Sequence, residues 1–204
     1  FQNEFCKQLH SLCADYYLGL WNGREKPFIF SEKQMKTFGV SQPKQQADRK
    51  VPGQPFLFNS WDDAKIHFNH RTLSKLSLHL IMSERIEELK KHALCNYEFL
   101  LAKLCAQDIS KLHSDFNTAT HVINDLELRL VQDTFRLSSL TIYENPKSTL
   151  APEIIGRLLG LATRHPEFTH LRKLVEDAMK AGEEFNVLLP THPCFSVPGG
   201  MLQS

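Results

Sequence analysis

The sequence predicts a mainly α fold, in which a winged-helix-like N-terminal piece with a short β wing precedes an arm of antiparallel helix hairpins. Apolar residues recur at intervals of three and four along most of the chain, which is the period of a helix with one buried face. Capping and helix-ending residues divide these stretches into separate helices, and a segment rich in Pro, Gly and Gln follows the first of them. We therefore predict three parts, over residues 1–68, 69–182 and 183–204.

The first part begins with a helix predicted over residues 2–21. Asn22 and Gly23 end this helix, because a glycine just past the last turn is a common helix stop. Two aromatic runs, Phe28–Phe30 and Phe56–Phe58, predict two short strands around a solvated loop, which form a wing and not a core sheet. The apolar stripe of the helix consists of Phe5, Leu9, Leu12, Tyr16 and Leu20.

The second part, the arm, begins with helices that are marked by residues able to cap them. We expect Thr72 to cap the helix of the segment "TLSKLSLHLIMSER", and Ser83 to cap a helix over Glu84–Leu94. Asn96 is expected to cap a helix over Tyr97–Ala106, and a further short helix is expected within 109–122. The apolar stripe of the first of these helices consists of Leu73, Leu76, Leu80 and Ile81.

The longest predicted helix is Asp125–Glu144, and its apolar residues cover more than one face, as in a helix buried between neighbours. Pro152 fits the first turn of a helix to about Arg164, and Pro166 fits the first turn of another to about Ala181, which Gly182 closes. The third part contains three prolines and two adjacent glycines, so it is predicted to be an extended connector.

Charge and cysteine content exclude several classes of protein. The 24 basic and 23 acidic residues give a net charge of +1, whereas a dedicated nucleic-acid or membrane-surface binder needs a basic surplus. The five cysteines are odd in number and form no C-x-x-C pair, which favours free thiols in the cytoplasm over a disulfide framework. No apolar run approaches the roughly 20 residues of a membrane span. Because the chain begins at Phe1 without a leader, we expect a piece of a longer cytoplasmic protein.

Motifs for catalysis are absent from the sequence, so we expect no enzyme and no resident metal. There is no phosphate-binding G-x-x-x-x-G-K-[ST] loop, no G-x-S-x-G elbow and no H-E-x-x-H pair. His67 and His70, downstream of Asp62 and Asp63, could share a helix face as metal ligands, but a third ligand is missing. Cys13 follows His10 by three residues on a regular helix, which suggests packing more than thiol catalysis.

Three segments resemble the region after the nucleotide-binding module in NACHT and WD-repeat domain-containing proteins, which are STAND-class P-loop ATPases. They are "LHSLCADYYLGLW", "ADRKVPGQP" and "NHRTLSKLSLHLIMSERIEELKKHALCNYEFLLAKL", and the tail "PTHPCFSVPGGML" resembles the link into a WD-repeat propeller. The resemblance implies the end of a winged helix, a helical arm and a linker, without the ATP site. It also implies ADP or ATP in the full-length protein, the NACHT and WD-repeat domains of the same chain as partners, and self-association on activation.

The resemblance also gives His10 a candidate role. In the related apoptotic protease-activating factor and in NOD-like receptors, a winged-helix histidine contacts the β-phosphate of ADP six residues before an aromatic residue. His10 and Tyr16 have that spacing, so the resemblance implies that His10 contacts ADP. The alternative is an ordinary packed or surface histidine. We expect His79 to be a satisfied core or groove histidine, because it lies between Leu78 and Leu80 on an apolar helix.

Two functions remain open at this point. The first is a non-catalytic segment that couples a sensor propeller to a nucleotide-binding module, for autoinhibition and oligomerisation. The second is a helical scaffold that binds a partner peptide or helix in a groove, which an exposed apolar groove between the helices of residues 72–106 would favour.

Overall fold

Helices build almost all of the regular structure in the computed structural model, which describes residues 4–24, 31–39 and 50–199. Within these ranges the mainly α prediction is confirmed. No described helix has the length and apolar character needed to cross a bilayer. The elements in chain order are α1 (Glu4–Tyr17), α2 (Glu32–Phe38), α3 (His70–Met82), α4 (Ile86–Leu89), the π-helical turn η1 (Lys90–Leu94), α5 (Tyr97–Ala106), α6 (Ile109–Val122), α7 (Leu126–Leu137), α8 (Ser139–Glu144), α9 (Pro146–Arg164) and α10 (Thr169–Glu184).

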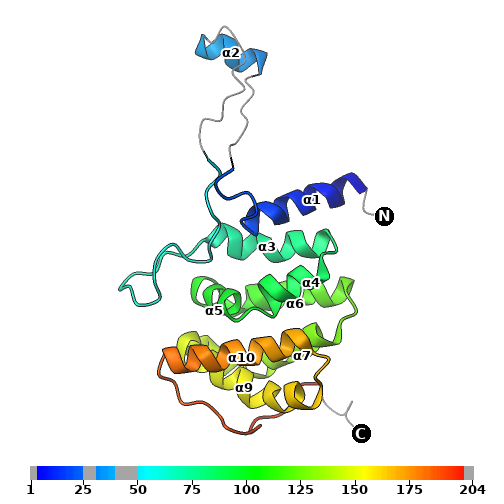
Figure 1. Ribbon diagram of the computed structural model, residues 1–204, viewed down its shortest axis with the longest axis vertical. Coiled ribbons are helices and arrows are strands. Elements are labelled where there is room, and N and C mark those ends of the chain that lie inside the picture. Colours follow the sequence, from blue (N-terminus) through cyan, green and yellow to red (C-terminus); the bar gives the residue numbers. More distant parts are fainter. Residues whose placement is uncertain (1–3, 25–30, 40–49, 200–204) are drawn as a thin grey trace.

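The helices are stacked in layers from α1 at one end to α9 and α10 at the other (Figure 1). The helix α1 packs on α3, α6 packs on α7, and α10 runs along α9. A continuous apolar core joins the layers between α3 and α10. Its largest fully buried apolar side chains include Phe99, Phe116, Phe135, Leu73, Leu76 and Leu80.

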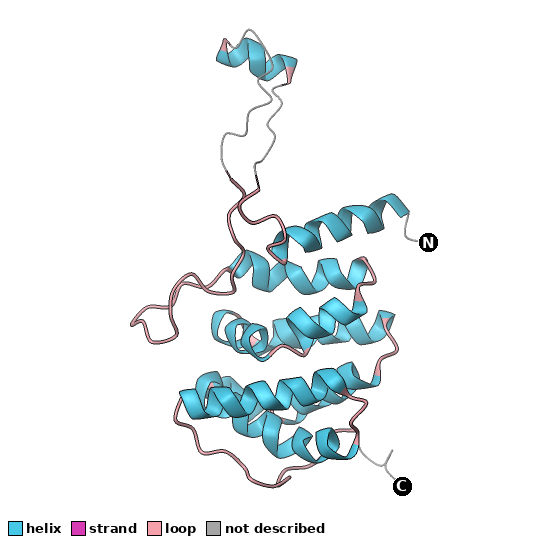
Figure 2. Cartoon of the chain, in the orientation of Figure 1, coloured by secondary structure: helices cyan, strands magenta, loops and turns pink. Residues whose placement is uncertain are grey.

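The predicted β wing is wrong as far as the described residues extend, because they contain no strand (Figure 2). The run Phe56–Phe58 forms a single bridge, in which Leu57 lies opposite Phe68. The ring of Phe56 packs edge-on against Phe99 of α5, with 5.4 Å between ring centroids, so the helical core takes up the aromatic side chain. The other predicted strand, Phe28–Phe30, lies outside the described residues. A winged helix with a wing is therefore not supported.

A short helix, α2, occupies part of the segment predicted to be a solvated loop. Ser31 accepts a hydrogen bond from the N–H of Gln34, and the Gln34 side chain accepts one from the N–H of Ser31. This reciprocal capping box starts the helix, and Gly39 ends it in the left-handed conformation.

Several helix boundaries in the arm differ from the prediction. Asn69, and not Thr72, caps α3, because its side chain accepts a hydrogen bond from the N–H of Thr72. Ser83 ends α3 and does not start α4, since its hydroxyl donates back to the carbonyl of His79. The prediction for α5 is confirmed at both ends, with Asn96 as its cap.

The predicted long helix Asp125–Glu144 is divided at Ser138 into α7 and α8. The Ser138 hydroxyl donates to Oε2 of Glu153 over 2.6 Å, and Nε of Arg157 donates to the Ser138 Oγ over 2.8 Å. The next helix, α9, begins at Pro146, so Pro152 lies inside it and not in its first turn. Helix α10 begins at Thr169, three residues after Pro166.

The described residues after α10, 185–199, have no regular structure and fold back along α9 and α10. Phe195 lies over Gly156, where a Cβ would come within 2.3 Å of its ring, and Pro193 lies over Gly160 in the same way. The two glycines of "GRLLG", which have no side chains, therefore let this tail pack closely on α9, and it is not another helix that packs against them. Arg157 donates to the carbonyl of Ser196 over 2.9 Å, which fastens the tail further.

Candidate functional site

The structure places His10 on the inner side of α1, against α3. The Nδ1 atoms of His10 and His79 lie 2.9 Å apart, so one imidazole donates a hydrogen bond to the other. Tyr17, two turns further along α1, stacks on the His79 ring with 5.6 Å between centroids and 15° between planes. His10 is therefore a half-buried interhelical contact and not an isolated surface residue.

This histidine pair holds one shared proton between its two Nδ1 atoms. Burial lowers the pKa of His79, and the charges of His10 and Lys75 lower it further. When His79 donates from Nδ1, His10 must accept at Nδ1 and carry its own proton on Nε2. In that tautomer Nε2 of His10 is a donor to which no described residue forms a hydrogen bond.

Positive charge accumulates beside the histidine pair. The charge of Lys75 lowers the pKa of His79. Burial raises the pKa of the Tyr17 phenol, and the charge of Arg71 opposes this increase. Both basic side chains are exposed, and neither forms an ion pair within the described residues. An anion near His10 would therefore meet uncompensated positive charge.

Charged contacts beside the histidine pair hold α1 to the turn after α3. Arg85 donates to Oδ1 of Asp15 over 2.5 Å and to the carbonyl of Ser11 over 3.2 Å, and it also pairs with Glu88. Lys7 pairs with Glu84 over 2.6 Å. These contacts fix the rotation of α1 about its axis and so keep His10 against His79.

The outer side of α1 exposes apolar side chains. Leu9 is 44% exposed and Leu12 is 49% exposed, one turn apart on the helix. The only buried residue of the helix is Ala14. An apolar stripe at the end of a helical stack is typical of a surface that another domain covers.

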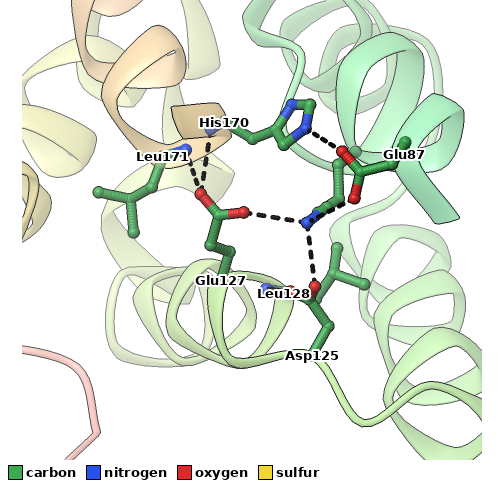
Figure 3. A network of polar contacts seen from close by, with 7 residues as sticks. Glu87, Asp125, Glu127, Leu128, His170 and Leu171 are labelled. Atoms are coloured by element: carbon green, nitrogen blue, oxygen red, sulfur yellow. Dashed lines mark hydrogen bonds and ion pairs between the residues drawn. The ribbon is translucent and has the colours of Figure 1, made fainter. Parts of the chain in front are cut away.

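A second polar centre connects the layers deeper in the stack (Figure 3). Nζ of Lys90 lies 3.0 Å from Asp125, 3.0 Å from Glu127 and 3.1 Å from Glu87. The other oxygen of Glu127 accepts the N–H groups of His170 and Leu171, at the start of α10. Every group has a partner, so this centre joins η1, α7 and α10 and is structural in character.

The other candidate residues from the sequence do not converge. The described residues contain no group of three or more His, Cys, Asp or Glu side chains that could hold a metal. The N–H of His67 donates to the side chain of Asn59, and Asp63 accepts from the N–H of Ser60, as in a hydrogen-bonded loop. Cys13 is exposed on α1.

His79 is the residue whose role the sequence did not reveal. It was expected to be a satisfied core or groove histidine, and it does have a partner, but the sequence did not show that this partner is His10. The two residues are 69 positions apart, and only the packing of α1 on α3 brings them together. A single sequence contains no local signal for such a pair.

The chain is similar to one segment of multidomain proteins that carry a NACHT domain together with WD repeats. Human NACHT and WD repeat domain-containing protein 2 is 26% identical over 206 residues, covering 94% of this chain, and mouse NACHT domain- and WD repeat-containing protein 1 is 28% identical over 199 residues, covering 96%. The chain spans about 12% of the length of these relatives. No family model and no solved structure matches the chain. The resemblance predicted from the sequence is therefore confirmed.

Proposed function

We propose that this chain is a non-catalytic helical segment of a cytoplasmic NACHT and WD-repeat signalling protein. In this proposal the segment couples a WD-repeat sensor to a nucleotide-binding module and helps to hold the resting state closed. On activation it permits self-association. Similarity to one segment of such proteins supports the proposal. The observation that carries it is the surface of α1, which combines exposed Leu9 and Leu12 with an imidazole that has an available donor.

In the intact protein, the exposed stripe of α1 would pack against the neighbouring nucleotide-binding module. His10 would then donate from Nε2 to a phosphate oxygen of bound ADP, while Lys75 and Arg71 increase the local positive potential. His79 would act as the positioning residue, because its hydrogen bond to Nδ1 keeps the His10 proton on Nε2. One such bond joins two domains through a ligand, and its loss favours their separation.

The test is nucleotide retention by the full-length protein that contains this chain. A hydrogen bond to a charged group contributes roughly 1.5–3 kcal/mol, so His10→Ala should weaken ADP retention by about ten-fold or more and raise basal self-association. Gln8→Ala, an exposed substitution on the same helix, is the matched control and should change neither property. ADP released on denaturation is measured by chromatography, and the oligomer by light scattering. Unchanged ADP content and unchanged oligomeric state in His10→Ala would refute the contact.

The alternative function, a scaffold that binds a partner peptide or helix in a groove, lacks the feature that it predicts. The helices between residues 70 and 106 bury most of their apolar side chains, so they leave no exposed apolar groove of the kind that this alternative predicts.

A further inference from the structure

The tail, residues 185–199, and the outer face of α9 fit each other closely at the end of the stack opposite α1 (Figure 1). The ring of Phe195 lies over Gly156. Pro193 lies over Gly160, one helical turn further along α9, so the tail runs antiparallel to this helix. Because the two glycines are four residues apart, they share one face of α9, which we call the glycine face. A Cβ at the first glycine would overlap the ring, and one at the second would press on the proline, so the glycine face has the shape of this segment.

Polar contacts add to this fit, and a buried guanidinium provides two of them. Arg157 lies between the two glycines in sequence and is only 9% exposed. Its Nη1 donates to the carbonyl of Ser196 over 2.9 Å, and its guanidinium carbon lies 5.3 Å from the centre of the Phe195 ring. The N–H groups of Cys194 and Phe195 both donate to the carbonyl of Gly156 over 3.3 Å. The glycine face therefore recognises the backbone of the tail as well as its aromatic ring.

A short turn joins the tail to α10 and has the features of a hinge. Asn186 in this turn has a φ of 53°, in the left-handed region that asparagine adopts more readily than most residues. Leu188 is 94% exposed, and the next residue, Leu189, packs over Gly182 near the end of α10. Among the described residues, the backbone N–H groups of 188–199 form hydrogen bonds with α9 alone. This part of the tail therefore has no internal hydrogen-bonded framework to lose when it leaves α9.

We infer that the glycine face of α9 binds the tail of a second copy of this chain when its own tail is withdrawn. The contacts are the same in both cases, because only the turn at Asn186 decides which chain supplies the tail. Within one chain, a short link gives the tail an effective concentration on the order of millimolar, so the intramolecular contact prevails in dilute protein. Two chains whose turns have opened can exchange their tails reciprocally, and this dimer restores both contacts. The surface lies far from α1 in the stack, so the inference does not depend on the nucleotide contact of His10.

The test mixes two variants of the whole 204-residue chain, each of which has lost one half of the contact. Gly156→Ala keeps the tail but blocks its own glycine face, because the added Cβ would overlap the Phe195 ring. Phe195→Ala keeps the glycine face, but its tail lacks the ring. The mixture should form a dimer of one chain of each kind, in which the tail of the Gly156→Ala chain occupies the glycine face of the Phe195→Ala chain.

Sedimentation equilibrium measures this association between about 10 µM and about 1 mM, a range that reaches the effective concentration of the tail. The mixed dimer should be at least about ten-fold tighter than the association of either variant with itself, because an aromatic anchor carries a large share of the affinity of such a contact. Limited proteolysis identifies the tail as the contact. The tail of Gly156→Ala should be cut rapidly in the isolated chain and should be protected in the mixture.

Two controls separate tail exchange from general association. The double variant Gly156→Ala with Phe195→Ala has neither half of the contact, so it should form no dimer with either single variant. Leu188→Ala, introduced into the Gly156→Ala chain, changes an exposed residue of the same segment and should leave the mixed dimer unaffected. Gly160→Ala, which blocks the position of Pro193, is a second variant of the glycine face in case Gly156→Ala unfolds.

Circular dichroism establishes that each variant is folded. The inference is overturned if the mixture stays monomeric up to about 1 mM, if the double variant dimerises equally well, or if the mixture leaves the tail as susceptible to protease as before. A tail that is fully protected in isolated Gly156→Ala would also overturn it, because the glycine face would then not hold the tail. A mixed dimer with a protected tail supports the inference.

Discussion

Lys90 is expected to be the most sensitive charged residue of the stack, and Lys90→Met tests this expectation. The substitution keeps an unbranched side chain of similar length but removes the ammonium that contacts Asp125, Glu127 and Glu87. The side chains of Lys90 and Glu127 are 7% and 8% exposed, and that of Asp125 is 19% exposed, so two nearly buried carboxylates lose their counter-ion.

The magnitude follows from this burial. Removal of one partner from a buried ion pair costs about 3–5 kcal/mol, because the remaining charge is left uncompensated. Glu87 is 76% exposed, so its contact adds under about 1 kcal/mol. Burial by itself lowers the pKa of Lys90, but the hydrogen bonds that its ammonium donates to Asp125, Glu127 and Glu87 outweigh this effect and raise the pKa. For a domain of this size the loss corresponds to a fall in Tm of roughly 6–20 °C.

Urea unfolding followed by circular dichroism at pH 7 measures the change. Lys173→Met is the matched control, because Lys173 is 58% exposed and its pair with Asp177 should contribute under about 1 kcal/mol. Adding Glu127→Gln to Lys90→Met should recover about 1–3 kcal/mol, since glutamine is neutral and its oxygen can still accept the two N–H groups of α10. A Lys90→Met variant within 1 kcal/mol of the parent, in protein that unfolds in one transition, would contradict this account.

Two further expectations concern α1 and the tail. His79 has a lowered pKa in the fold, so its contribution to stability is fully present above the unfolded pKa of about 6.5 and is lost as pH falls from there through the lower folded pKa. The protection of the α1 amides against hydrogen exchange, corrected for the intrinsic exchange rate at each pH, should therefore fall between pH 7 and pH 5 in the parent. An equal fall in His79→Gln would exclude the histidine as the cause. Gly156→Ala gains helix propensity of up to about 1 kcal/mol but forces Phe195 away, so limited proteolysis should cut the tail faster. In a Phe195→Ala background the same substitution should raise Tm. Equal effects in both backgrounds would show that the two residues do not meet.

Local features of this chain were predictable where one short segment contains all the atoms involved. Asn96 caps α5 through a side chain that bonds within three residues, and it was identified as a cap from the sequence. Asp125 caps α7 in the same way, whereas the sequence predicted it only as the first residue of the helix. The capping box of Ser31 and Gln34 is equally local, so its spacing could have predicted α2.

Features that depend on contacts between distant segments were not predictable in this way. The break at Ser138 requires Glu153 and Arg157 of another helix, and the sequence around Ser138 continues a helical pattern. The Phe56 run has strand composition, but its ring is buried against α5, which only the tertiary packing determines. His10 was identified from a resemblance, while its partner His79 became visible only in the packed helices.

The contact of Arg157 with the tail has a mechanical consequence. The same guanidinium bonds to Ser138, to Glu153 and to the Ser196 carbonyl, so it joins the bend between α7 and α8 to a chain segment near the C-terminal end of the described residues. Arg157 is 9% exposed, and water cannot readily replace any one of these bonds. A pulling force on the tail would therefore act directly on the bend between α7 and α8. The tail would detach in a single step above a threshold force, and not residue by residue.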